Sequence, residues 1–180
     1  MDAARGVPDS TLAVCMARNG VEFGLQVAGA GGQWFTAPAE VVDGLYFPGY
    51  STADAAADLG DSAICETAGL GGFAMAAAPA IAGFVGGDAR TTLTATRQMY
   101  KISMQEAALY RIPSLDMRGS PFGIDCREVV DQRLAPVINT GIAHRQAGVG
   151  QIGAGIVNAP LACFAVALRE VRRRWRAQME

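Results

Sequence analysis

The pattern of apolar and polar positions predicts an antiparallel β meander at the start of the chain. Two short apolar runs, residues 11–17 (TLAVCMA) and 21–28 (VEFGLQVA), flank the tripeptide Arg-Asn-Gly at residues 18–20. An Asn-Gly pair between two such runs is typical of a tight hairpin turn. A second turn at residues 29–32 (GAGG) leads to a third short run, QWFTA, at residues 33–37. We therefore expect three consecutive antiparallel strands.

A polar segment and then an uncharged segment follow the meander. Residues 43–66 contain Pro48, several glycines and four aspartates, a composition that predicts a long irregular loop, and such loops are often functional. Residues 68–87 form a stretch of 20 residues without a charge, which is long enough to span a membrane. The stretch is mostly Ala and Gly, with Pro79 inside, so we expect a buried core helix over residues 70–85 instead.

The remaining pattern alternates between helices and strands. Asp88 is expected to cap a helix within residues 88–107, and residues 109–116 resemble a strand that a proline interrupts. Residues 123–134 predict a short helix and residues 135–140 a strand.

The last segment predicts a long amphipathic helix that begins near Pro160. Its apolar residues recur at spacings of three and four: Leu161, Phe164, Leu168, Val171, Trp175 and Met179. The predicted fold class is α+β: an antiparallel meander packed on the buried Ala/Gly-rich helix, with further helices and the C-terminal helix. We expect residues 1–180 to form a single domain.

Composition narrows the classes of function. The chain is 51% hydrophobic and 18% charged, which is enough apolar material for a sizeable core, and its net charge of −2 points to neither nucleic acid nor a membrane surface. The four cysteines are scattered and only one histidine is present, so we expect no metal site. Unpaired cysteines and the absence of an apolar leader fit a cytoplasmic protein.

The only histidine, His144, lies in a glycine-rich stretch, residues 139–155. Within it, Gly148, Gly150 and Gly153 spell G-x-G-x-x-G, but a dinucleotide fingerprint would need a strand directly before and a helix directly after. A tight loop with positive φ is the favoured interpretation, and a nest of backbone amides for an anion stays open. For His144, both a catalytic and a structural role remain open.

Three acids precede the uncharged segment: Asp58, Asp61 and Glu66. Acids near a helix N-terminus are often only dipole partners, which is the favoured interpretation for Asp58. A carboxylate that enters an apolar wall can instead gain a raised pKa and act as a base, and for Glu66 the two interpretations are equally supported.

Several longer stretches together resemble one bacterial family. They include ARNGVEFG (17–24), DGLYFPGYS (43–51), DLGDSAICETAGLGGFAMAAAPAI (58–81), PVINTGIAH (136–144) and GVGQIGAG (148–155). They are similar to the YlbE/AllG-like family, whose better-understood members resemble subunits of oxamate carbamoyltransferase.

The resemblance implies an α+β fold and work within a multi-subunit complex. We expect no cofactor. The resemblance also implies transfer of a carbamoyl group between carbamoyl phosphate and oxamate or a related small amide, in allantoin breakdown. Family members are typically more than twice as long, and the chain resembles their C-terminal portion. Its expected partners are the other subunits or the missing N-terminal half, in a homo- or hetero-oligomer.

Carbamoyl transfer requires anchors for anions, donors for a developing oxyanion and a base for the attacking nitrogen. We expect His144, Glu66 or Asp61 to move the proton and Arg18 to supply a bidentate fork. The candidate substrate-binding residues are Arg18, Asn19, Asn139, Thr140, Gly148, Gly150, Gln151 and Gly153. We expect His144, Asn19, Glu66 and the 148–153 loop to reach one small ligand.

Two rival classes of function remain. The chain could be a non-catalytic interaction subunit whose Ala/Gly segment packs on a partner. It could also be a hydrolase of small amides or ureides, which would use water and show no dependence on phosphate.

Overall fold

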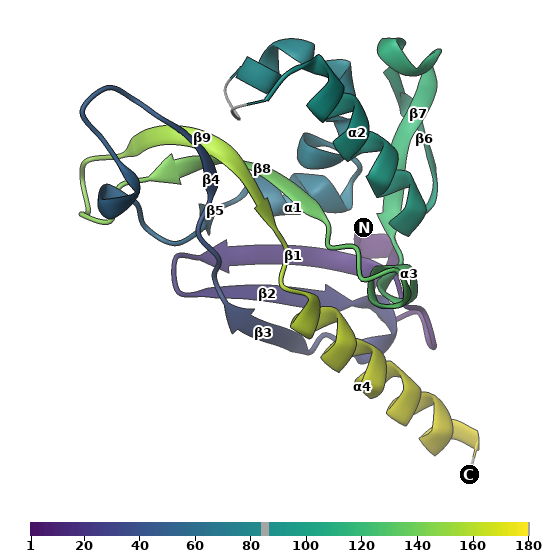
Figure 1. Cartoon of the computed structure of the whole chain (residues 1–180). Helices are drawn as coiled ribbons and strands as arrows, with labels where there is room; N and C mark the ends of the chain where they lie inside the picture. The colour runs from purple at the N-terminus through teal and green to yellow at the C-terminus, as the bar shows by residue number, and fades with distance from the viewer. Residues whose placement is uncertain (84–86, 180) are drawn as a thin grey trace.

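The computed structural model describes residues 1–83 and 87–179. Within them the chain is α+β, as its sequence predicts, and all three sheets are antiparallel (Figure 1). The strands are β1 (Ala13–Asn19), β2 (Glu22–Val27), β3 (Trp34–Pro38), β4 (Asp43–Tyr46), β5 (Leu59–Gly60), β6 (Ser103–Ile112), β7 (Arg118–Ile124), β8 (Val137–Ala143) and β9 (Gln151–Asn158). The α-helices are α1 (Ser62–Thr67), α2 (Ala89–Met99), α3 (Cys126–Asp131) and α4 (Leu161–Met179). Short 3₁₀ helices are η1 (Asp2–Ala4), η2 (Ala28–Ala30), η3 (Thr52–Asp54), η4 (Gly71–Ala77), η5 (Pro79–Gly83), η6 (Tyr100–Ile102) and η7 (Pro113–Leu115).

The predicted meander is confirmed. Strands β1, β2 and β3 pair in sequence order, and β5 adds to the free edge of β1. Gly20 takes a φ of +83° in the β1–β2 turn, a conformation that favours glycine over other residues. The short helix α3, the strand β8 and the long helix α4 also lie where the sequence predicts them.

The predicted loop at residues 43–66 is only partly irregular. It contains β4, β5 and α1, and β4 pairs with β9 at the edge of a second sheet in the order β4–β9–β8. Strand β9 was itself not predicted, because glycines made residues 148–155 resemble a loop. Gly153 and Gly155 instead allow β4 to approach closely: a Cβ at Gly155 would lie 2.1 Å from the Asp43 carbonyl oxygen.

The uncharged segment does not form one continuous helix. Residues 71–77 and 79–83 form the 3₁₀ helices η4 and η5, and residues 84–86 of the predicted helix lie outside the described part. Phe73 and Met75 of η4 are buried, whereas residues 77–80 are exposed. The segment packs mainly on α2 and β8, while the meander contacts α1 and α4. No helix in the described residues combines the length and apolarity that a membrane span requires.

The helix predicted within residues 88–107 ends early. Asp88 caps α2 by accepting the Thr91 N–H at 2.8 Å, as predicted, but α2 ends at Met99. Residues 103–112 form β6, which pairs with β7 in a hairpin at the top of the view in Figure 1.

The main core lies where the meander, β8 and α4 meet. It includes Phe23 and Leu25 of β2, Phe35 of β3, Ile138 of β8 and Phe164 of α4. This packing brings one face of β1, the start of α1 and the middle of β8 together, and a buried polar cluster fills the junction.

Candidate functional site

Arg18 is the centre of this buried cluster. The side chain of Arg18 is 0% exposed, on the face of β1 that looks into the molecule. Its Nε donates to Asp58 Oδ2 at 2.8 Å, and its Nη2 donates to Ser62 Oγ at 2.8 Å and to Thr140 Oγ1 at 2.6 Å. Its Nη1 donates to the Gly60 carbonyl oxygen at 3.3 Å. One guanidinium therefore ties β1 to β5, α1 and β8.

The internal hydrogen bonds of Arg18 change its expected role. A guanidinium has five N–H donors, and the contacts above use most of them, so the fork that the sequence suggests for a substrate anion is occupied by protein. Burial raises the pKa of Asp58, while the hydrogen bond and charge of Arg18 act in the opposite direction. Asp58 Oδ1 has no hydrogen-bond partner in the described residues. The pair positions Thr140 and Ser62 rather than presenting a free charge.

Glu66 is a second buried carboxylate close to this cluster. It lies on α1, is 0% exposed, and its Oε1 accepts the Gly72 N–H at 2.8 Å and the Asn139 N–H at 3.0 Å. Its Oε2 has no hydrogen-bond partner within the described part of the chain. Burial raises the pKa of Glu66 to about 7, and the backbone hydrogen bonds offset this only in part. A carboxylate with such a pKa can take up or release a proton near neutral pH.

Glu66 is separated from solvent by glycine backbone. We call residues 69–72 (Gly-Leu-Gly-Gly) the glycine segment. Gly71 is exposed, has a φ of +59°, and a Cβ there would stand 2.1 Å from Glu66 Oε1. Gly69 also has a positive φ, of +76°. The carboxylate therefore lies directly beneath Gly71, which is the exposed residue of a segment whose conformation depends on glycine.

Four residues that the sequence singles out meet here: Arg18, Glu66, Asn139 and Thr140. Asn139 and Thr140 are neighbours on β8, and they contact Glu66 and Arg18 respectively. The charge of Arg18 is one of the influences that lower the pKa of Glu66, which agrees with their proximity.

His144 lies at the opposite end of β8. It lies five positions along the chain from Asn139, which corresponds to about 16 Å along an extended strand. Its Nδ1 accepts the Gln146 N–H at 2.8 Å, and its ring lies edge-on to Tyr50 with 5.8 Å between the ring centroids. The structure therefore separates His144 from Glu66, and a catalytic role for His144 stays a prediction.

The G-x-G-x-x-G pattern spans a turn and a strand. Gly148 and Gly150 have φ values of +87° and +93° in the β8–β9 turn, as the tight-loop interpretation requires. Gln151 begins β9 and its Nε2 donates to the Gly153 carbonyl oxygen at 2.9 Å. Gly148, Gly150, Gln151 and Gly153 therefore lie on the His144 side of the sheet and not beside Glu66.

Asn19 and Asp61 occupy local positions. Asn19 Oδ1 accepts the N–H groups of Val21 at 2.9 Å and Glu22 at 2.8 Å, which closes the β1–β2 turn. Asp61 is exposed and precedes α1 without a capping hydrogen bond from its side chain.

The sequence interpretation missed Ser62, Gly60 and the glycine segment as parts of the cluster, and it favoured a minor role for Asp58. Strand alternation held a usable signal. Met16 and Arg18 fall on the same face of β1, so an inward-facing Met16 predicts an inward-facing arginine, which then needs a buried carboxylate.

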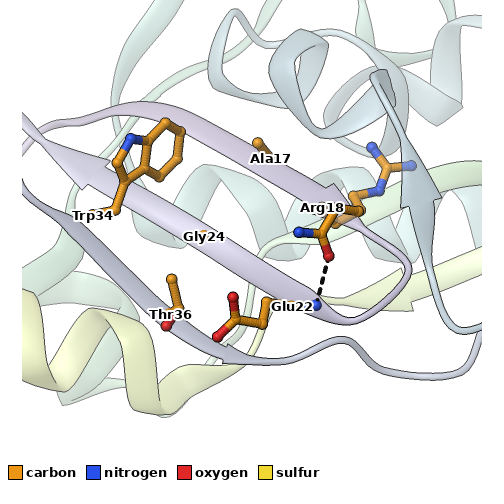
Figure 2. A pocket seen from close by; sticks show the side chains of 7 residues that line it. Ala17, Arg18, Glu22, Gly24, Trp34 and Thr36 are labelled. Atoms are coloured by element: carbon orange, nitrogen blue, oxygen red, sulfur yellow. Dashed lines mark hydrogen bonds between the residues drawn. The ribbon is translucent and has the colours of Figure 1, made fainter.

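A separate pocket of about 220 Å³ lies on the outer face of the meander (Figure 2). The side chains of Glu22, Trp34 and Thr36 surround Gly24 in it, and the Arg18 guanidinium points away to the other side of the sheet (Figure 2). In the described residues, no group of three or more His, Cys, Asp or Glu side chains is placed to hold a metal ion.

Comparisons with known proteins agree with the resemblance in the sequence. Residues 1–62 match the family described as oxamate carbamoyltransferase subunit AllG. The chain is 47% identical to oxamate carbamoyltransferase subunit AllG of Escherichia coli K12, over 93% of this chain and 40% of that protein. It is 54% identical to the uncharacterized protein YahG of the same organism, over 93% of this chain and 36% of that protein.

A solved structure shows the same fold. The crystal structure of a conserved protein of unknown function from Enterococcus faecalis V583 matches with a TM-score of 0.93 and 49% identity, over 96% of this chain and 41% of that one. The chain thus spans less than half the length of these relatives. The comparisons confirm that the chain is AllG-like in sequence, the family that its motifs indicate.

Proposed function

We propose that the chain works in the cytoplasm as one part of a carbamoyltransferase complex, and that it corresponds to the C-terminal portion of its longer relatives. The complex would transfer a carbamoyl group between carbamoyl phosphate and oxamate or a related small amide. The observation that carries the proposal is the 47% identity to oxamate carbamoyltransferase subunit AllG over 93% of the chain.

Glu66 is the proposed proton acceptor of this reaction. The amide nitrogen of the acceptor attacks the carbonyl carbon of carbamoyl phosphate, the bond from carbon to the phosphate oxygen breaks, and the nitrogen loses a proton. A pKa near 7, an unpartnered Oε2 and a cover made of glycine backbone suit Glu66 to receive that proton once the glycine segment moves aside. The N–H groups of Gly69, Leu70 and Gly72 already donate within the protein, so the Gly71 N–H is the proposed donor to the oxyanion.

The anchor for the phosphate is assigned to another part of the complex. Arg18 is enclosed and paired with Asp58, so it holds the β8 residues next to Glu66 in place instead of binding an anion. The site would then be completed only when the remaining subunits dock.

The test is reconstitution of the 180-residue chain with the other subunits, followed by an assay of phosphate release from carbamoyl phosphate. Release that requires both oxamate and this chain would support the proposal. If carbamoyl phosphate is not consumed, and an amide or ureide is instead hydrolysed to ammonia, the hydrolase alternative replaces it.

A non-catalytic interaction subunit is the second candidate, and the β6–β7 hairpin favours it. Four large apolar side chains there are exposed: Met104 (57%), Leu109 (86%), Tyr110 (45%) and Met117 (57%). Exposed apolar side chains concentrated on one hairpin are typical of an element that binds a partner. On this alternative the complex needs the chain for assembly, while Glu66 can be neutralised without loss of turnover.

A further inference from the structure

The outer pocket on the meander has chemistry different from the Glu66 region. Its lining residues come from one face of three strands: Ala17, Asn19, Glu22, Gly24, Trp34 and Thr36, with Arg18 at its rim. The Arg18 guanidinium is fully buried on the opposite side of the sheet and paired with Asp58 (Figure 2). The pocket is therefore distinct from the buried cluster, although β1 contributes to both.

Trp34 forms one wall of this pocket. A Cβ at Gly24 would stand 2.9 Å from Trp34 Cε3, closer than such contacts normally are, so the indole needs a glycine at this position. Trp34 is nevertheless 45% exposed. The pocket thus holds an aromatic surface that the fold supports and that remains accessible to a ligand.

Among the described residues that line the pocket, Glu22 is the one whose charged group faces it. It is exposed and forms no salt bridge within residues 1–83 and 87–179. Trp34 lies opposite Gln26 in the β2–β3 register, four positions along β2 from Glu22, which is about 13 Å. Gly24 lies midway between Glu22 and Gln26, and its missing side chain leaves the space that the Trp34 indole occupies on the side toward Glu22.

The polar groups beside the indole suit a planar cation. The side-chain oxygen of Asn19, Oδ1, already accepts the N–H groups of Val21 and Glu22, so the Glu22 carboxylate is the group that can accept hydrogen bonds from a ligand. The Thr36 hydroxyl lies beside it, opposite Gly24 in the register. An aromatic wall with a carboxylate attracts a cation through the ring quadrupole and through direct charge.

We propose that this pocket binds a guanidinium group between Trp34 and Glu22. A guanidinium can stack flat on the indole and donate two parallel N–H groups to the carboxylate, which a compact ammonium cannot do. Carbamoyl phosphate and oxamate are anions, so the pocket is not a second site for the substrates of the proposed transferase. The group can come from a small molecule or from an arginine of another protein chain.

The test uses methylguanidinium as the probe and the Trp34 indole N–H signal in two-dimensional NMR as the readout. A Trp175→Phe background leaves Trp34 as the only tryptophan. We expect a saturable shift with methylguanidinium, a weaker one with methylammonium, and none with the neutral isostere methylurea. Glu22→Gln should weaken binding about fivefold or more, as expected for loss of a partly exposed charge pair. Glu40→Gln, which removes an exposed charge outside this pocket, should leave binding unchanged.

Sedimentation velocity with and without methylguanidinium identifies the source of the group. If Glu22→Gln or methylguanidinium dissociates an oligomer, the guanidinium belongs to an arginine of a neighbouring chain; if the chain is monomeric and still binds the probe, the ligand is a small molecule. Both results support the proposal. Equal shifts with methylurea, or equal affinity in Glu22→Gln, would overturn it.

Discussion

Glu66 and Asp58 are both buried, but different groups compensate their charge. Asp58 has a guanidinium at 2.8 Å, whereas Glu66 has only backbone N–H donors on Oε1 and none on Oε2. Backbone dipoles stabilise a carboxylate less than a full opposite charge does, so burial controls the pKa of Glu66. At the residue scale, Glu66 is therefore the group that is poised to change its protonation state near neutral pH.

This difference predicts a pH-dependent effect of Glu66→Gln on stability. Because the pKa of Glu66 rises from 4.5 to about 7 on folding, the folded state holds the proton more tightly than the unfolded state. The contribution of Glu66 to the free energy of unfolding is most favourable below about pH 4.5. It falls as the pH rises from there to about 7 and is constant at higher pH. Gln keeps an acceptor for the Gly72 and Asn139 N–H groups but carries no charge.

We expect wild type and Glu66→Gln to have similar thermal midpoints at pH 5, and Glu66→Gln to be more stable at pH 8, by at most about 3 kcal/mol. Thermal unfolding by circular dichroism across this range checks the prediction. The exposed Glu40→Gln should show a constant difference from wild type. A constant difference for Glu66→Gln as well would contradict the account.

Arg18 predicts a second residue-scale result. Arg18→Met should cost about 3–5 kcal/mol of unfolding free energy, because Asp58 is left buried without its partner. The double variant Arg18→Met, Asp58→Asn should recover part of this loss. Urea unfolding measures both; a double variant whose loss equals the sum of the single losses would show that the pair is not coupled.

At the scale of elements, the glycine segment decides how Glu66 is covered. Gly71→Ala places a methyl group against Glu66 Oε1 in a left-handed conformation, so we expect a loss of about 1–3 kcal/mol or more. Gly83→Ala is the matched control, because a Cβ there meets no atom of residues 1–83 and 87–179 within 4 Å and its φ is not positive. Urea unfolding of both variants checks this. Equal effects of the two substitutions would argue against close contact between the segment and Glu66.

Elements with strong local signals could be predicted from the sequence. The Asn-Gly turn, the Asp88 cap and the periodicity of α4 each act over a few residues, and each lies where it was expected. The elements that the sequence did not predict are determined by tertiary contacts. Residues 103–107 (SMQEA) have helix-forming composition but pair with β7, and β9 carries glycines because β4 passes close to it.

The candidate site could be predicted only as separate pieces. Arg18, Glu66, Asn139 and Thr140 were recognisable as polar residues at element ends, and they do meet. The sequence also predicted that His144 and Glu66 reach one ligand. In the structure β8 continues to Ala143 instead of ending at residue 140, and it separates His144 from Asn139, which contacts Glu66. The link from Arg18 to Ser62 depends on contacts between residues 44 positions apart, for which local sequence gives no signal.

At the scale of the whole molecule, the exposed apolar side chains of the β6–β7 hairpin predict association. We expect the double variant Met104→Lys, Leu109→Lys to bind the remaining subunits at least about tenfold more weakly, because it places two charges on an apolar surface. Its thermal midpoint should be nearly unchanged, since both side chains are mostly exposed.

Sedimentation or calorimetric titration of the variant against the other subunits measures this loss. Val21→Lys is the matched control, because Val21 is 74% exposed on a different hairpin. Equal binding by the hairpin variant and the control would remove the hairpin from the interface.

We propose that Glu66 accepts the proton during carbamoyl transfer in the assembled complex. The most direct measurement is the turnover of the reconstituted complex at pH 8 with wild-type or Glu66→Gln chain, with the thermal midpoint of each chain measured in parallel. The account predicts that Glu66→Gln lowers turnover by about 10²–10⁴-fold while the chain is at least as stable as wild type. Wild-type turnover with Glu66→Gln, or a loss confined to His144→Gln, would contradict it.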